Sequence, residues 1–169
     1  LSNMIAAIQI AKLYKINNIL IKSAVEEFKP LLHRMEILDI KSNITFINDS
    51  KGTNLVSTMA AVESIENKIL LILGGYSDEE INMDTIKKIS CKEYIYKIVC
   101  YGKIGKDISK KIKKSNYQKI FSDAVLHAIK AAIPNSTLLL SPGFKSFDQF
   151  NSFEERGNTF KKIVFKHFA

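Results

Sequence analysis

A continuous apolar run, KILLIL, spans Lys68–Leu73 and ends in the pair Gly74-Gly75. A strand that is apolar on both faces is typical of a sheet that helices cover on both sides. On either side of this run, short strand-like segments alternate with helical ones. The alternation predicts an α/β fold with a mostly parallel sheet and right-handed crossovers. We therefore expect a Rossmann-like, doubly wound domain.

The other elements are predicted from hydrophobic period, turn residues and capping residues. Strands are expected at 36–41, 44–48, 68–73, 94–101, 117–121 and 137–140. Helices are expected at 3–14, 22–29, 55–65, 83–90, 103–114, 123–132 and 152–167. Ser42-Asn43 resembles a tight turn, so the first two strands should form an N-terminal β-hairpin. Asp123 is the expected N-cap of its helix.

The composition is that of an ordinary globular protein. Of the 169 residues, 46% are apolar and 25% are charged, which argues against disorder, collagen and coiled coil. No apolar run approaches the roughly 18 residues of a membrane helix, and no signal peptide is visible. Cys91 and Cys100 lack metal-ligand spacing, so we interpret them as buried thiols in a reducing cytoplasm. Because the chain starts with Leu1, we expect a piece of a longer protein.

The net charge of +8 is concentrated in one segment. Residues 103–119 hold seven lysines and one aspartate, a net +6. Within it, Ile104, Ile108 and Ile112 recur at helical spacing, so the lysines are interpreted as the solvated face of an amphipathic helix. The alternative is a non-catalytic basic module that binds RNA or another polyanion.

Arginine is rare, since 23 of the 25 cations are lysines. A guanidinium grips a carboxylate or phosphate bidentately, which an ammonium cannot do. Arg34 and Arg156 therefore point weakly to sites where lysine would not serve. The alternative for Arg156 is a helix-surface pair with the neighbouring Glu154 and Glu155.

Polar residues follow several predicted strands, where ligands of open α/β sheets bind. The segment NDSKGTN, residues 48–54, lies between a strand and a helix, whose N-terminus favours an anion. Lys51 can neutralise a carboxylate or phosphate, and Asp49 can accept from sugar hydroxyls or hold a cation. The alternative is a polar turn in which Asp49 or Thr53 only caps the helix.

Two further segments contribute to this picture. HRME, residues 33–36, offers Arg34 to a phosphate, while His33 is more often a structural residue. The segment 141–157 offers the hydroxyl of Ser146 and three phenylalanines spaced by three, which are interpreted as a helical core stripe. The chain has neither GxGxxG nor GxxxxGK[ST], so it cannot cradle ATP in the usual way by itself.

Taken together, HRME, NDSKGTN, ILGGY and LLLSPGFKSFDQFNSFEERGNTF resemble the Mur ligase family, in collinear order over essentially the whole chain. Within the family, NDSKGTN points to the enzymes that add D-glutamate. The resemblance implies that residues 1–29 are the C-terminal remnant of a central ATPase domain. It also implies that residues 30–169 are the Rossmann-like C-terminal domain.

The resemblance implies an ATP-dependent ligase that adds D-glutamate to UDP-N-acetylmuramoyl-L-alanine in peptidoglycan synthesis, through an acyl phosphate. ATP and Mg²⁺ would be bound mainly by the central domain, so the isolated chain should not turn over. The expected protein is a cytoplasmic monomer that binds neither membrane nor nucleic acid. A degraded gene product with no present role is the lesser alternative.

Residue roles follow from the resemblance alone, and it implies no metal ligand in this chain. Arg34 and Lys51 match catalytic positions. Asn3, Arg34 and Asp49 match positions that contact ATP. The positions that match the D-glutamate pocket are Thr53, Ser146, the backbone at Phe147, and Phe153.

One departure from the family pattern bears on substrate binding. A lysine that pairs with a D-glutamate carboxylate is common shortly after the Gly-Gly turn, and here Asp78 stands at the corresponding position. An acid facing a carboxylate repels it, and the reversal would cost several kcal/mol in a partly buried site. Either Lys145 supplies the cation in a rearranged pocket, or the gene is drifting after losing its function.

Overall fold

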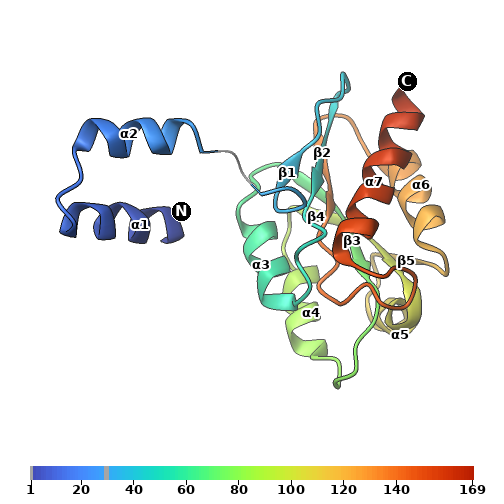
Figure 1. Ribbon diagram of the computed structural model, residues 1–169. Coiled ribbons are helices and arrows are strands. Elements are labelled where there is room, and N and C mark those ends of the chain that lie inside the picture. Colours follow the sequence, from blue (N-terminus) through green and yellow to red (C-terminus); the bar gives the residue numbers. More distant parts are fainter. Residues whose placement is uncertain (1, 29–30) are drawn as a thin grey trace. The chain divides into compact units, whose positions relative to one another are not determined.

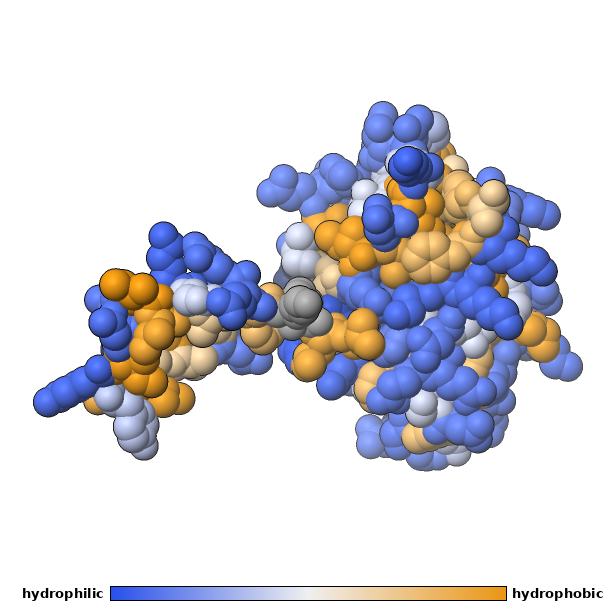
Figure 2. All heavy atoms as spheres, turned by 45° about the horizontal axis from the view of Figure 1, so that its top comes forward, coloured by the Kyte–Doolittle hydropathy of each residue, from blue (hydrophilic) through white to orange (hydrophobic). Residues whose placement is uncertain are grey.

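The computed structural model describes residues 2–28 and 31–169 and divides the chain into two units, residues 1–31 and 32–169 (Figure 1). The first unit holds α1 (Ser2–Leu13) and α2 (Asn18–Glu26). The second helix begins four residues before its expected start, because the Asn17 side chain accepts from the Ile19 N–H and caps it there. No residue of α2 is buried, and large apolar side chains such as Leu13 and Leu20 are exposed. Figure 2 shows hydrophobic atoms on the surface of this unit.

The second unit is built on a six-stranded sheet in the order β1-β2-β6-β3-β4-β5. The strands are β1 (Glu36–Ile37), β2 (Ile44–Asn48), β3 (Lys68–Gly74), β4 (Ile95–Tyr101), β5 (Ser115–Gln118) and β6 (Ser136–Leu140). All neighbours are parallel except β1 and β2, which pair antiparallel. The predicted α/β sheet and its hairpin are confirmed. The first strand is shorter than expected, so residues 38–43 join the pair in place of a two-residue turn.

Helices cover both faces of the sheet. The side chains of α3 (Leu55–Glu63), α4 (Met83–Ser90) and α5 (Gly102–Lys111) share one core cluster, and those of α6 (Phe121–Ala131) and α7 (Phe153–Phe168) share the other. In β3, Leu71 and Leu73 belong to the first cluster, and Leu70 and Ile72 belong to the second. All four are fully buried, as a doubly wound sheet requires.

Several local expectations are wrong. The basic helix ends at Lys111, and Ile112 is extended yet still buried. Asp123 does not cap α6, which begins two residues earlier behind Ile120 and has no side-chain cap. Cys91 is exposed, because it lies just past the end of α4, whereas Cys100 is buried in β4 as expected.

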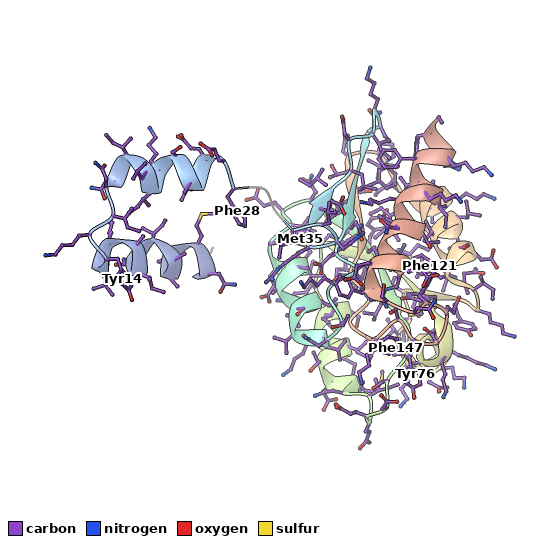
Figure 3. The ribbon with its side chains drawn as sticks, viewed as in Figure 1. Tyr14, Phe28, Met35, Tyr76, Phe121 and Phe147 are labelled. Carbon is purple, nitrogen blue, oxygen red and sulfur yellow. The ribbon has the colours of Figure 1, made fainter. Side chains whose placement is uncertain are left out.

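The phenylalanines at 147, 150 and 153 do not form a helical stripe. Because α7 begins only at Phe153, behind the capping Ser152, the first two lie in the loop after β6. Phe147, which is labelled in Figure 3, is 64% exposed, while Phe150 packs against Phe121 with the ring centroids 5.1 Å apart. A spacing of three therefore reflects loop packing here and not a helix face.

The strand order identifies one end of the sheet as the expected ligand site. The neighbouring strands β3 and β6 lead to α4 and α7, whose side chains pack on opposite faces. Where neighbouring strands lead away to opposite faces, ligands of open α/β sheets bind beyond the carboxyl ends of the strands. We call this region of the chain the crevice. The loops after β2, β6 and β3 surround this point. None of the helices in the described part of the chain is long and apolar enough to cross a membrane.

Candidate active site

The loops after β2 and β6 are joined by direct hydrogen bonds. The Asp49 N–H donates to the Leu140 carbonyl at 2.7 Å, and the Gly143 N–H donates to the Gly52 carbonyl at 2.8 Å. A Cβ at Gly52 would lie 2.5 Å from Asp49 Oδ2 and 2.8 Å from the hydroxyl of Ser141, so no larger residue fits. The structure therefore brings the segment 48–54 against the segment 141–146.

The loop after β3 is attached to the same assembly. Tyr76 pairs antiparallel with Lys145 through two backbone hydrogen bonds of 2.9 and 3.1 Å. Gly75 adopts φ +126°, and a Cβ there would lie 2.4 Å from the Lys145 carbonyl oxygen. The Gly-Gly pair thus permits close backbone approach, which explains its presence without a dinucleotide fingerprint.

Asp49 is a buried carboxylate in the loop directly after β2. It is 5% exposed, and it accepts hydrogen bonds from the Ser141 hydroxyl at 2.7 Å and from the Met35 N–H at 3.3 Å. Burial raises the pKa of Asp49, while these two hydrogen bonds and the charges of Arg34 and Arg156 act in the opposite direction. The carboxylate is therefore rigidly held and electrically coupled to both arginines of the chain.

Two exposed cations accompany this carboxylate. Arg34 lies between His33 and Met35 in the loop before β1, close enough for its charge to lower the pKa of Asp49. Lys51 donates its backbone N–H to the His33 carbonyl at 2.9 Å. Its ammonium lies 5.5 Å from the centroid of the Phe153 ring. The two cations thus come from loops that bind each other.

The residues matched to the D-glutamate pocket occupy different levels of exposure. Ser146 is buried at 3%, Thr53 and Phe153 are half-buried, and the Phe147 side chain is exposed. Neither Asp49 nor Thr53 caps α3, because the Asn54 side chain accepts from the Ser57 N–H in that role. The expectation that Asp49 or Thr53 caps the helix is therefore wrong, and the side chains of Asn48, Asp49 and Ser50 bond to other parts of the chain.

Arg156 is the residue of this assembly whose structural role was least visible in the sequence. It is fully buried at the start of α7, so the interpretation as a helix-surface pair is wrong. It donates to the Ser50 carbonyl at 2.8 Å and the Ser50 hydroxyl at 3.0 Å, and to the Phe144 carbonyl and the Tyr101 hydroxyl, both at 3.1 Å. One guanidinium thus fixes both site loops to the end of β4. The rarity of arginine was the signal that could have identified it.

The remaining predicted features belong to other segments of the chain. Asn3 belongs to α1 in the first unit, and its contact with ATP stays a prediction. Within the described residues, no group of three or more His, Cys, Asp and Glu side chains could hold a metal ion. On α5, Ile104 and Ile108 are buried and the lysines face solvent, as expected. The ammonium of Lys114, beyond the helix, instead donates to the carbonyls of Lys92 and Ile95.

Several curated proteins that resemble this chain carry the same name. UDP-N-acetylmuramoylalanine–D-glutamate ligase from Buchnera aphidicola subsp. Schizaphis graminum is 39% identical over 164 residues, which is 95% of this chain and 37% of that protein. The protein of the same name from Thermoanaerobacter sp. strain X514 is 33% identical over 171 residues, again 37% of its length. The chain thus spans somewhat more than a third of the curated relatives it matches. No family model matches the chain.

Solved structures agree on the fold. MurF from Acinetobacter baumannii superimposes with a TM-score of 0.69 at 18% identity, covering 95% of this chain and 37% of that one. The bifunctional folylpolyglutamate synthase/dihydrofolate synthase from Yersinia pestis CO92 gives 0.65 at 12% identity, covering 88% and 34%. Sequence and fold agree: the chain belongs to the Mur ligase family and corresponds to the C-terminal portion of its UDP-N-acetylmuramoylalanine–D-glutamate ligases.

Proposed function

We propose that this chain is the C-terminal part of an ATP-dependent ligase that adds D-glutamate to UDP-N-acetylmuramoyl-L-alanine in peptidoglycan synthesis. The observation that carries the proposal is the union of two strand-end loops around Asp49, with Arg34 and Lys51 beside it. The names of the relatives supply the substrate. The protein would be cytoplasmic and monomeric, and the isolated chain would not turn over.

The cations of the crevice suit the phosphates of a nucleotide. ATP, with Mg²⁺ bound mainly outside this chain, would supply the phosphoryl group that activates the acceptor carboxylate. The guanidinium of Arg34 offers paired donors to phosphate oxygens, and Lys51 offers a point charge. Asp49 presents carboxylate oxygens to a ribose hydroxyl. Both cations are exposed, so they can reach a ligand held by another part of the protein.

D-Glutamate needs donors for two carboxylates and a place for its amine. The hydroxyls of Thr53 and Ser146 and the backbone N–H of Phe147 can donate to carboxylate oxygens, and the Phe153 ring can pack against the carbon chain. Lys145 is the cation nearest in sequence to this set. Its ammonium lies 3.0 Å from Asp78 Oδ2, so Asp78 neutralises a lysine and does not face the pocket as an unpaired acid.

The test is a titration of the ¹⁵N-labelled chain with D-glutamate, followed by amide chemical shifts. We expect weak binding, with shifts confined to the segments 49–54 and 143–148, and smaller shifts with L-glutamate at the same concentration. Ser146→Ala should reduce the affinity, and Ser109→Ala on α5 is the matched control. Equal responses to both enantiomers, or shifts confined to other segments, would refute the assignment of this pocket.

The basic surface of α5 provides the competing function, and the same chain tests it. A polyanion-binding module should bind single-stranded RNA in a salt-dependent way through exposed lysines such as Lys106, Lys110 and Lys111. We expect no such binding by filter retention. If the filter retains RNA with the wild-type chain but not with a variant in which these lysines are changed to glutamate, the result would favour the RNA-binding module over the ligase.

A further inference from the structure

The loop that carries Arg34 has an unusual backbone. His33 and Met35, on either side of it, adopt φ values of +61° and +48°, a region that residues other than glycine rarely occupy. Such a conformation persists only where the surroundings fix it. Here the His33 carbonyl accepts from the Lys51 N–H at 2.9 Å, and the Met35 N–H donates to Asp49 at 3.3 Å. Arg34 is thus held between two anchors on the segment 48–54.

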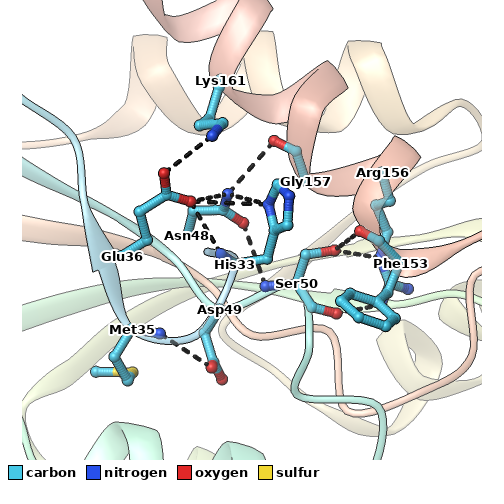
Figure 4. A network of polar contacts seen from close by, with 10 residues as sticks. All are labelled: His33, Met35, Glu36, Asn48, Asp49, Ser50, Phe153, Arg156, Gly157 and Lys161. Atoms are coloured by element: carbon cyan, nitrogen blue, oxygen red, sulfur yellow. Dashed lines mark hydrogen bonds and ion pairs between the residues drawn. The ribbon is translucent and has the colours of Figure 1, made fainter. Parts of the chain in front are cut away.

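The His33 ring is buried between Asn48 and Gly157. It is 4% exposed and packs against the first turns of α7, with its centroid 6.4 Å from that of Phe153 (Figure 4). A Cβ at Gly157 would lie 2.3 Å from His33 Nδ1, so only glycine leaves room for the ring. The position of the ring therefore depends on both α7 and the loop, which are far apart in sequence.

Hydrogen bonds around Asn48 fix the proton state of this ring. Asn48 Oδ1 accepts from the Ser50 N–H at 3.2 Å, which orients the amide. Its Nδ2 then lies 2.9 Å from His33 Nδ1 and 3.0 Å from Glu36 Oε2. Because an amide nitrogen only donates, His33 Nδ1 must accept, and the ring is neutral with its proton on Nε2.

Protonation of Nδ1 would break this arrangement. The new N–H would oppose the Asn48 donor and instead face Glu36 Oε2, which is 3.7 Å away. Burial and the charge of Lys161 lower the pKa of His33, whereas Glu36 and Glu154 act in the opposite direction. Glu36 is already engaged, since it accepts from Lys161 at 2.9 Å and from the His33 N–H at 3.0 Å. A charged ring therefore has no free partner in its present position.

We propose that His33 is a positioning residue for Arg34: its neutral ring, wedged between Asn48 and Gly157, holds the guanidinium at the crevice, and protonation releases it. The contact of Arg34 with a nucleotide rests on the proposed function, but the positioning of Arg34 by His33 does not. It can therefore be tested without nucleotide.

The composition of the chain makes the test direct. With only three histidines and two arginines, the side-chain NMR signals of each can be followed individually in the full 169-residue chain. On acidification from pH 7, the Arg34 Nε and Cζ signals should shift with the same midpoint as the His33 ring, below pH 6.5. The signals of Arg156 should stay constant through that step and report an intact fold. Arg34 signals that ignore the His33 transition would overturn the proposal.

A substitution separates His33 from Asp49, whose carboxylate also faces Arg34. His33→Asn tolerates the left-handed backbone but removes the ring. At pH 7 it should move the Arg34 signals to their acidic position and abolish the His33-linked shift. His167→Asn, at the exposed end of α7, is the matched control and should change neither. Unchanged Arg34 signals in His33→Asn would also overturn the proposal, and if that variant fails to fold, the wild-type titration decides alone.

Discussion

Two regions of the crevice each hold a cation, in opposite environments. The α7 side consists of Arg156 and its partners, and the β3 side consists of Tyr76, Asp78 and Lys145. On the α7 side, Arg156 is fully buried and bonded to a hydroxyl and two carbonyls of the site loops and to Tyr101. On the β3 side, Lys145 and Asp78 form one ion pair, and their side chains are 48% and 54% exposed. Because Arg156 is buried, solvent cannot replace a partner that it loses, whereas solvent can reach the half-exposed ammonium of Lys145.

This difference divides the roles of the two sides. A buried charge is costly to leave unpaired, so the α7 side must keep its geometry for the chain to fold. An exposed ion pair contributes little to stability because water screens it, so its members can exchange partners. The α7 side therefore fixes the shape of the crevice, and the β3 side is available to adapt to a ligand.

Substitution of Arg156 should have the largest effect on the stability of the chain. Arg156→Met removes four hydrogen bonds and leaves two buried carbonyls without this donor, so we expect a loss of about 3 kcal/mol or more in the free energy of unfolding. Arg156→Lys should rescue little, because an ammonium cannot reproduce the fork. Urea denaturation followed by circular dichroism measures both. Lys166→Met, exposed on the same helix, is the control. If Arg156→Met lowers the free energy of unfolding by less than about 1 kcal/mol, Arg156 does not hold the two site loops together.

The backbone approach at Gly75 should produce the next largest effect. Gly75→Ala places a Cβ against the Lys145 carbonyl and keeps an unfavourable φ of +126°, so we expect a loss of about 2 kcal/mol. The same urea titration checks this. Ala60→Gly, exposed on α3, is a control for the general effect of an Ala/Gly exchange, about 1 kcal/mol. A stable Gly75→Ala protein with unchanged amide shifts at Tyr76 would show that the β3 loop is not held this closely.

Acidification tests the α7 side in a graded way. The pKa of His33 is lowered from 6.5, so its stabilising contribution is complete above pH 6.5 and is lost as the pH falls through the folded-state value. Burial opposes ionisation of Glu36, but Lys161 and the His33 N–H lower its pKa below 4.5, so its own contribution is lost only below pH 4.5. Thermal unfolding between pH 7 and 5 should show a decline that His33→Asn removes.

Asp49 contributes to the same pH profile with the opposite sign. Because its pKa is raised from 3.8, the folded chain binds a proton more readily than the unfolded chain, and stability decreases as the pH rises through that window. Asp49 is present in both the wild type and His33→Asn, so its contribution cancels when the stability of one protein is subtracted from that of the other at each pH. A decline between pH 7 and 5 that is identical in both proteins would exclude His33 as its source.

The sequence predicted the parts of the fold that depend on local pattern. The apolar run at 68–73 identified a central strand, and the parallel order followed from alternation with helices. The sequence placed the segments 48–54 and 141–146 at the same edge of the sheet, and the family resemblance grouped Thr53 with Ser146. The direct hydrogen bonds between the two segments follow from the adjacency of β2 and β6, which no local pattern predicts. The burial of Arg156 and of His33 was not predicted either, because it depends on α7 packing across the sheet against loops about 100 residues away. No local period carries such a contact.

The smallest effect on stability, and the sharpest test of the β3 side, comes from Asp78. Asp78→Asn removes an exposed ion pair that water screens, so the free energy of unfolding should not change measurably. At the same time it frees Lys145 for a carboxylate, so D-glutamate should bind several-fold more tightly in a calorimetric titration of the chain. Lys145→Met should weaken binding, and Glu79→Gln, an exposed neighbouring acid, should change neither quantity.

If Asp78→Asn leaves the affinity unchanged while Lys145→Met reduces it, then Lys145 already faces the ligand and the ion pair does not compete. If both leave it unchanged, the β3 side lies outside the pocket, and the fixed α7 side alone would hold the amino acid.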